Sequence, residues 1–167
     1  MKYTIYLGLG SNIGNRLENI LSTLSFIQSS LLIKIVKLSS LYEASPVGPT
    51  QKFFYNIILK AKTNLHPYDL LFFLKQLEQI LGRKKTIKWG PRIIDIDILF
   101  FGNKVFNNSL LSIPHKELQN RLFVLIPLNE IAKNLVHPTL NKTIHVILKE
   151  KLLTLKQQKV KIIKIYT

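Results

Sequence analysis

A tight turn leading into an apolar strand is predicted for the stretch Trp89-Gly90-Pro91-Arg92-Ile93-Ile94-Asp95-Ile96-Asp97-Ile98-Leu99-Phe100-Phe101-Gly102. Residues two apart on a strand share a face, so Asp95 and Asp97 would project together while the isoleucines around them face a core. Asp is uncommon in strands and is rarely buried without a partner or a metal. A solvated strand face is the alternative, but this strand is otherwise apolar. We therefore expect Asp95 and Asp97 to bind Mg²⁺, which takes few carboxylates and completes its shell with water and phosphate oxygens.

The length and composition indicate one soluble domain. A chain of 167 residues, 47% of them hydrophobic, is long and apolar enough to bury a core. It contains no Cys, which fits a reducing compartment, and no apolar run approaches the roughly 18 residues that span a membrane. We expect a single domain over residues 1–167, forming a cytoplasmic monomer with no membrane partner. Residues 151–167 are rich in Lys, and the sequence assigns them no role.

The net charge is strongly positive, at +15 from 24 Lys and Arg against 9 Asp and Glu. Such a charge attracts polyanions, either a nucleic acid or a polyphosphate ligand. A compositional bias toward Lys explains the charge equally well, so the four arginines are more informative: Arg16, Arg83, Arg92 and Arg121. Arg suits bidentate contacts to phosphate, and three of the four lie in the half of the chain that carries most motifs.

The predicted elements follow the order strand, helix, strand, strand, helix, strand. Hydrophobic spacing and turn residues place strands at 3–9, 31–43, 53 to near 64, and 93–101, and helices at 16–30 and 66–81. This order is typical of the ferredoxin-like α+β fold, in which an antiparallel four-stranded sheet carries both helices on one face. The other face is then free for a ligand or for additional elements. Beyond residue 102 we expect a C-terminal helical extension, with extended pieces at 104–106 and 110–114 and helices at 115–123, 124–131 and 143–150.

Glycines cluster directly after the first predicted strand, between Gly8 and Gly14. Their spacing is neither that of a dinucleotide-binding turn nor that of a phosphate loop with Gly-Lys-Ser/Thr. We therefore expect these glycines to interrupt the strand and to serve in turns or packing.

Basic residues lie on both sides of the predicted turn. Arg83 follows the second helix, and Lys84, Lys85 and Lys88 lead toward Arg92. A solvated basic loop is the simpler interpretation. Beside carboxylates that bind a metal, however, Arg83 and Arg92 would offset the charge of a transferred phosphoryl group. A charged loop of this length could also close over a ligand as a lid.

Phe54 and Asn56 alternate onto one face of the third predicted strand. The simpler interpretation of Phe54 is core packing. If the free face of the sheet binds a flat heterocycle, Phe54 would stack on it while Asn56 bonds its edge, with Phe123 as a second stacking partner. His115, which stands six residues before Arg121, is a candidate phosphate contact, although a lone His is more often structural.

Several short motifs occur in order along the chain: Gly10-Ser11-Asn12, Pro46-Val47-Gly48-Pro49, Phe54-Tyr55-Asn56, Glu78 with Gly82-Arg83, Trp89-Gly90-Pro91-Arg92 with Asp95-Ile96-Asp97, and Pro114-His115 with Asn120-Arg121 and Phe123. Through them the chain resembles the 6-hydroxymethyl-7,8-dihydropterin pyrophosphokinase family of folate biosynthesis over about residues 3–140. The block Trp-Gly-Pro-Arg-x-x-Asp-x-Asp is the most specific part of this resemblance.

The resemblance implies a reaction and a set of contacts. ATP, as the co-substrate, would donate its β,γ-diphosphate as one unit to the pterin hydroxymethyl group and leave AMP. Two Mg²⁺ ions would bind Asp95 and Asp97, with Arg83 and Arg92 as further catalytic residues. The implied pterin contacts are Ala44, Val47, Phe54, Asn56, Trp89 and Phe123. The implied ATP contacts are Lys75, Glu78, Lys85, Trp89, Arg92, Ile98, Ser112, His115, Lys116 and Arg121.

Some positions depart from the family pattern. Lys116 stands where relatives often have an aromatic residue, and Lys75 stands where they often have a polar residue or Arg. Lys85 and Lys88 would be weaker bidentate phosphate clamps than Arg. These departures bear on the ATP contacts rather than on the paired carboxylates.

A basic nucleic-acid-binding module on the same scaffold is the alternative function. Paired acids on a strand oppose binding to a phosphate backbone but suit a metal–nucleotide complex, and the aromatic signature of RNA-binding strands is missing. We therefore expect ATP and the pterin as partners, and no nucleic acid.

Overall fold

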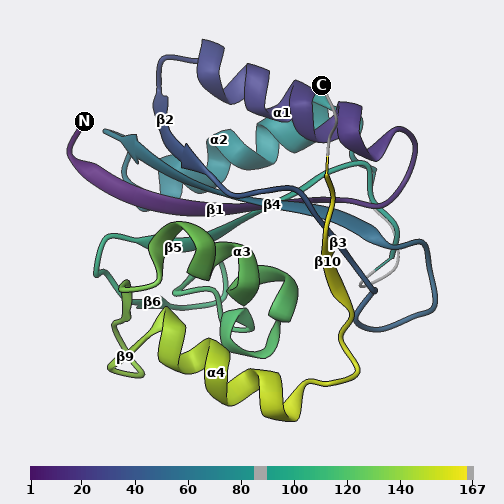
Figure 1. Ribbon diagram of the computed structural model, residues 1–167. Helices are drawn as coiled ribbons and strands as arrows, with labels where there is room; N and C mark the ends of the chain where they lie inside the picture. The colour runs from purple at the N-terminus through teal and green to yellow at the C-terminus, as the bar shows by residue number, and fades with distance from the viewer. Residues whose placement is uncertain (85–89, 165–167) are drawn as a thin grey trace.

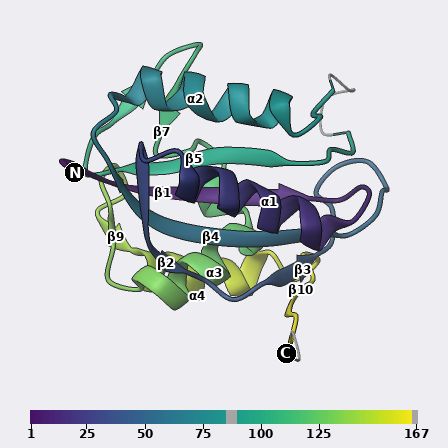
Figure 2. The ribbon, with the colours of Figure 1, turned by 90° about the horizontal axis from the view of Figure 1, so that it is seen from above.

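The computed structural model describes residues 1–84 and 90–164, which are built around one antiparallel sheet. The strand order is β10-β3-β4-β1-β5, and β2 also pairs with β4 (Figure 1, Figure 2). The elements up to β5 are β1 (Tyr3–Ser11), α1 (Arg16–Ser29), β2 (Ile33–Leu38), β3 (Tyr42–Ala44), β4 (Phe54–Thr63), α2 (Pro67–Ile80) and β5 (Asp95–Phe101). With β2 and β3 together as the second strand, this is the predicted ferredoxin-like order.

The two faces of the sheet carry different helices. Figure 1 shows α1 and α2 above the sheet and α3 (Leu122–Ala132) and α4 (Ile144–Thr154) below it. Each pair of helices closes its own hydrophobic core. Ile96 and Ile98 of β5 are buried on the side of α1 and α2, as predicted, whereas Leu99 and Phe100 are buried on the side of α3 and α4. The second face is thus covered in part by the C-terminal extension.

β1 lies between β4 and the edge strand β5, and it carries two glycines toward the second face. Gly10 pairs with Asn56 on one side and with Asp95 on the other, and Gly8 pairs with Asp97. A Cβ atom on Gly10 would lie 3.1 Å from the side-chain oxygen of Asn56, so a side chain there would crowd this face. The prediction that these glycines interrupt the strand is wrong, because β1 continues as a paired strand to Ser11.

The prediction of one strand over residues 31–43 is wrong, because this stretch forms the two strands β2 and β3. The Ser39 hydroxyl accepts the Ile58 N–H at 2.9 Å, while the Ser39 N–H donates to the Ile58 carbonyl at 2.8 Å. A side chain that takes over a ladder position interrupts regular pairing, so the chain leaves β4 after β2 and returns to it as β3. Ser39 and Ser40 interrupt the apolar residues at this break, a signal that the sequence interpretation did not use.

The predicted helix over residues 115–123 is also wrong. Only the short 3-10 helix η1 (Leu118–Asn120) forms, because the His115 ring nitrogen accepts the Glu117 N–H and Arg121 takes an extended backbone conformation. α3 begins after that extended residue and continues past Pro127, as the spacing at 124–131 predicts.

The remaining elements are two short hairpins and a last edge strand. They are the hairpins β6 (Phe106–Asn107) with β7 (Ser112–Ile113) and β8 (Val136–His137) with β9 (Lys142–Thr143), and the last strand β10 (Val160–Ile162). α4 is longer than the helix predicted at 143–150, and β10 pairs with β3 at the edge of the main sheet. Among the described residues, none of the helices is both long and apolar enough to cross a membrane.

Candidate active site

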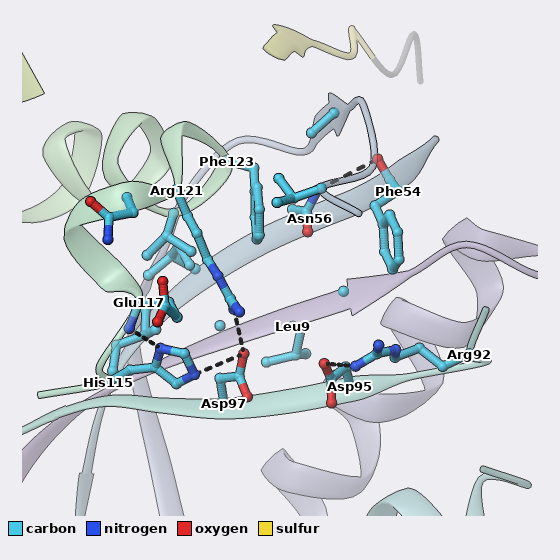
Figure 3. A pocket seen from close by; sticks show the side chains of 18 of the residues that line it. Leu9, Phe54, Asn56, Arg92, Asp95, Asp97, His115, Glu117, Arg121 and Phe123 are labelled. Atoms are coloured by element: carbon cyan, nitrogen blue, oxygen red, sulfur yellow. Dashed lines mark hydrogen bonds and ion pairs between the residues drawn. The ribbon is translucent and has the colours of Figure 1, made fainter. Parts of the chain in front are cut away.

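A cavity of about 420 Å³ lies between the second face of the sheet and the start of α3. Its floor comes from β1, β4 and β5, one wall from β3 and the loop after it, and the opposite wall from residues 115–124 (Figure 3). The cavity gathers residues predicted for catalysis and for the pterin: Arg83, Arg92, Asp95, Asp97, Ala44, Val47, Phe54, Asn56 and Phe123. These residues are spread over eighty positions of the chain, and the sheet brings them together.

A second cavity of about 370 Å³ adjoins the first and shares Lys75, Asp97 and His115 with it. Its far wall is formed by the hairpin of β6 and β7, at residues 107–112. The predicted ATP contacts that line it are Lys75, Ile98, Ser112, His115 and Lys116. Asp97 therefore stands at the junction of the two compartments.

Asp95 is held by two arginines at the turn end of β5. Arg83 Nη1 lies 2.5 Å from its Oδ1, and Arg92 Nη1 lies 2.6 Å from its Oδ2. Burial opposes the charged carboxylate, but Arg92 and Arg83 outweigh it and keep the pKa of Asp95 below its usual value. Asn12 fixes the turn, since its side-chain oxygen accepts the Arg92 N–H at 2.8 Å. Asp95 is thus an ionised carboxylate that already binds cationic groups.

Asp97 is less well compensated than Asp95. Arg121 Nη1 and His115 Nε2 lie 3.6 Å and 3.8 Å from its Oδ2, both too far for a hydrogen bond. Burial and the charge of Asp95 raise the pKa of Asp97, and burial lowers the pKa of His115. Figure 3 shows the Asp97 carboxylate directed toward Arg121 and His115 across the cavity. An additional cation beside Asp97 would therefore be stabilised.

Glu78 is a buried carboxylate that holds neighbouring residues of the site in place. It is 2% exposed, and its carboxylate accepts the Ile96 N–H at 2.7 Å while pairing with Lys75 at 3.0 Å and Arg83 at 2.5 Å. Burial, the dominant influence, raises the pKa of Glu78. Glu78 lines neither cavity, so it holds Arg83 against β5 in this structure, and its predicted contact with ATP stays a prediction.

Two aromatic rings and one amide form the other end of the first cavity. Phe54 comes from β4 and Phe123 from α3, and Figure 3 shows the Asn56 side chain between them. Phe54 belongs to neither hydrophobic core, so core packing does not explain it. The Arg121 guanidinium lies 5.7 Å from the centre of the Phe123 ring, within the range of a cation–π contact. This end of the cavity can hold a flat ring and bond its edge.

Three of the predicted site residues cannot be placed, and some residues that line the first cavity were not predicted. Lys85, Lys88 and Trp89 lie outside the described residues, so the contacts expected of them stay predictions. Arg121 lines the first cavity together with the predicted pterin residues. The sequence interpretation missed ten residues that line the first cavity: Gly8, Leu9, Gly10, Ser45, Gln51, Ile58, Leu99, Glu117, Asn120 and Val124. For the two glycines a signal existed, because glycines two apart on one strand keep one face clear.

The donor set fits a hard divalent cation that shares its ligands with a substrate. Within residues 1–84 and 90–164, no cluster of three or more His, Asp or Glu side chains could hold a metal on its own. Asp95 and Asp97 are oxygen donors on one strand face at the cavity, and their charges repel each other without a cation. Mg²⁺ commonly binds through one or two carboxylates together with substrate phosphates.

Comparisons with known proteins agree on one family. The sequence model of 7,8-dihydro-6-hydroxymethylpterin-pyrophosphokinase (HPPK) matches residues 6–133. The 2-amino-4-hydroxy-6-hydroxymethyldihydropteridine pyrophosphokinase of Aquifex aeolicus is 45% identical over 140 residues, covering 83% of this chain and 86% of that protein. The enzyme of the same name from Bacillus subtilis is 39% identical over 134 residues, covering 80% of each chain.

Other matches are to longer proteins. The folic acid synthesis protein fol1 of Pneumocystis carinii is 47% identical over 135 residues, which cover 80% of this chain and 18% of fol1. A solved structure of HPPK-DHPS in complex with substrates superposes with a TM-score of 0.75 at 17% identity, covering 93% of this chain and 44% of that chain. The chain thus spans less than half of these larger proteins, and the structural match supports the fold. The extent of the family match and the identity to relatives of similar length place this chain in the 7,8-dihydro-6-hydroxymethylpterin-pyrophosphokinase family.

Proposed function

We propose that this protein transfers the β,γ-diphosphate of ATP to the hydroxymethyl group of 6-hydroxymethyl-7,8-dihydropterin, giving AMP and the pterin diphosphate in folate biosynthesis. The observation that carries the proposal is the position of Asp97. It stands between an aromatic compartment that suits a flat heterocycle and a basic compartment that suits a nucleotide. The names of the relatives supply the identity of the pterin and of the transferred group.

The aromatic compartment explains how the pterin is held. A pterin ring between Phe54 and Phe123 gains stacking contacts on both faces. Asn56 is buried and carries both a donor and an acceptor, so it can read the edge of the heterocycle. Gly8 and Gly10 have no side chains and line the cavity, so they leave room for the ring on the second face of β1.

The basic side chains explain how the phosphates are held. Arg83, Arg92, Arg121, Lys75 and His115 all line the first cavity, and Lys75 and His115 also line the second. Arg83 and Arg92 are paired with Asp95 in this structure. When a triphosphate enters, these arginines can exchange a carboxylate oxygen for a phosphate oxygen, because a guanidinium suits both acceptors.

The transfer itself is an in-line displacement at the β-phosphorus. The hydroxymethyl oxygen of the pterin forms a bond to the β-phosphorus and loses its proton. The bond between the β-phosphorus and the oxygen that links it to the α-phosphorus breaks, and that oxygen leaves with AMP. Charge builds up on the phosphate oxygens during this step, and positioned guanidinium groups offset it.

Asp95 and Asp97 would hold Mg²⁺ for this reaction, and we propose two ions. Bound there, Mg²⁺ supplies charge neutralisation for the triphosphate. The chain's own contribution is to hold two carboxylates on one rigid strand beneath the phosphates. Asp95 is kept ionised by its arginines, whereas among the described residues the cationic groups nearest to Asp97 lie 3.6 and 3.8 Å away.

The proposal is tested by product analysis. The protein is incubated with MgCl₂ and ATP, with and without 6-hydroxymethyl-7,8-dihydropterin, and AMP and ADP are separated by chromatography. We expect AMP to form only when the pterin and Mg²⁺ are both present. Formation of ADP, or of AMP independently of the pterin, would overturn the proposal.

A further inference from the structure

The C-terminal segment Gln158–Ile162 contacts both walls of the pterin cavity. It lies outside the matched residues 6–133, and Figure 1 shows it running beside β3 at the edge of the sheet. One wall is β3 with the loop after it, and the other is the junction between η1 and α3. A segment that bonds to both walls sets the distance between them.

The contacts with the first wall are those of a sheet strand. Val160 pairs with Ala44, the Lys159 carbonyl accepts the Ser45 N–H at 2.9 Å, and the Ser45 hydroxyl accepts the Lys159 N–H at 3.0 Å. Lys161 adds an ion pair with Glu43 at 2.9 Å. Ala44 and Ser45 line the cavity, so this strand is bonded directly behind the pterin compartment.

The contact with the second wall is made by one side chain. The Gln158 side-chain oxygen accepts the Leu122 N–H at 2.8 Å, and its amide nitrogen donates to the Asn120 carbonyl at 2.8 Å. The two bonded residues flank Arg121 on either side. The Gln158 amide therefore fixes the backbone at Arg121 from behind while the Arg121 side chain extends into the cavity.

This bond also completes the start of α3. Arg121 is the N-cap residue and its side chain makes no capping hydrogen bond, so the first N–H groups of the helix need another acceptor. Gln158 supplies one for Leu122, the first residue of α3. Arg121 is thereby free to lie near Asp97 and over the ring of Phe123.

We propose that Gln158 is a positioning residue for the pyrophosphokinase reaction, and that it sets the placement of Arg121 and Phe123 against the pterin and the phosphates. The inference rests on the proposed function of the cavity. Gln158 touches neither cavity itself and acts through the backbone of residues 120–122. If Gln158 served only the stability of the fold, its substitution would lower stability alone. If it is a positioning residue, its substitution also weakens ligand binding in the folded protein.

The test compares Gln158→Ala with Gln157→Ala in the full chain. Gln157 is the neighbouring glutamine and is exposed. Gln157→Ala therefore controls for the removal of a glutamine side chain from this segment. Gln158→Glu is the second variant, because its carboxylate keeps the acceptor for Leu122 but loses the donor to Asn120. The dissociation constant of the pterin, measured with a non-hydrolysable ATP analogue and Mg²⁺ present, is determined well below the thermal midpoint of each variant. The kcat of AMP formation is measured in parallel.

We expect Gln158→Ala to weaken pterin binding by about 3- to 10-fold, as for the loss of a hydrogen bond, and to lower kcat. Gln158→Glu should fall between this variant and the wild type, and Gln157→Ala should match the wild type. If folded Gln158→Ala binds the pterin and turns over like Gln157→Ala, the inference is overturned while the proposed function stands. If the wild type forms no AMP, the proposed function fails and this inference fails with it.

Discussion

Asp95 and Asp97 project from one face of β5 into the same cavity, but their carboxyl pKa values are shifted in opposite directions. Asp95 is within 2.6 Å of two guanidinium groups, whereas the nearest guanidinium nitrogen is 3.6 Å from Asp97. One carboxylate is therefore stabilised by the protein itself, and we expect the other to be stabilised by a cation that arrives with the substrate.

Asp97→Asn should abolish catalysis without loss of stability. The folded protein disfavours the charge on Asp97, as its raised pKa shows, so neutralising it at neutral pH relieves burial and repulsion from Asp95. We expect a fall in kcat of at least about 10²-fold, typical of losing one group that stabilises the transition state, with a thermal midpoint that is unchanged or higher. Turnover and thermal unfolding of the same sample check both parts.

Asp95→Asn is the matched control for the expected effects of Asp97→Asn on kcat and on the thermal midpoint. The pKa of Asp95 is lowered in the folded state, so removing its charge leaves Arg83 and Arg92 uncompensated and should lower the thermal midpoint. Equal midpoints for the two variants, or retained turnover in Asp97→Asn, would contradict the division of roles between these carboxylates.

Phe54→Ala should act on the pterin and leave ATP binding unchanged. Stacking of a base on an aromatic side chain is worth about 1–3 kcal/mol by alanine substitution, which predicts a rise in the pterin dissociation constant of roughly 5- to 150-fold. The adjacent Phe53 is exposed and lines neither cavity, so Phe53→Ala is the control. Fluorescence titration with the pterin distinguishes the two variants. An unchanged constant in folded Phe54→Ala would assign this ring to packing.

Gly10→Ala should weaken pterin binding through Asn56. The added Cβ would lie 3.1 Å from the Asn56 side-chain oxygen, so the amide must move from the position in which it faces the cavity. We expect about a 10-fold higher pterin dissociation constant, in line with loss of a buried hydrogen bond, and an unchanged constant for ATP with Mg²⁺. Calorimetric titration with each ligand measures this. A loss of affinity for both ligands would show a general distortion of the sheet instead.

Acidification should destabilise the protein through His137. This residue is 4% exposed and packs edge-on against Phe100 with ring centres 5.5 Å apart, and burial lowers its pKa from 6.5. Below that pH the unfolded chain takes up a proton that the folded protein resists, so stability is lost as the pH falls toward the lowered pKa of the folded state. A tenfold difference in proton affinity between the folded and unfolded chain corresponds to about 1.4 kcal/mol of stability.

His137→Asn isolates this contribution. The Asn side-chain oxygen can accept the N–H groups of Thr139 and Leu140 that the His ring nitrogen accepts at 3.4 and 3.3 Å, and it does not titrate. Urea unfolding of both proteins at about pH 7.5 and about pH 5.5 gives the difference. The wild type should lose more free energy of unfolding than the variant. Equal losses would show that His137 does not carry the effect.

Much of the sheet and the acidic pair could be predicted because they depend on local patterns. A period of two placed Asp95 and Asp97 on one face and Ile96 on the other, as the structure has them. The order of strands and helices up to residue 101 was sufficient for the fold, since few topologies satisfy it.

The remaining features depend on contacts between distant residues. Ser39 divides the predicted strand by bonding to Ile58, and no local pattern records that bond. Gln158 bonds to Asn120, 38 residues away, in a Lys-rich tail that carries no turn signal. The helix expected at 115–123 fails because Arg121 is extended, and helical spacing alone does not distinguish that turn from a helix.

In the proposed reaction, two phosphoryl groups move together to the pterin. The most direct measurement is the ³¹P NMR spectrum of the pterin product after reaction with ATP and Mg²⁺. We predict two mutually coupled phosphorus signals on the pterin and one equivalent of AMP. A pterin product with a single phosphorus signal, accompanied by ADP, would show that only one phosphoryl group is transferred and would rule out the proposed reaction.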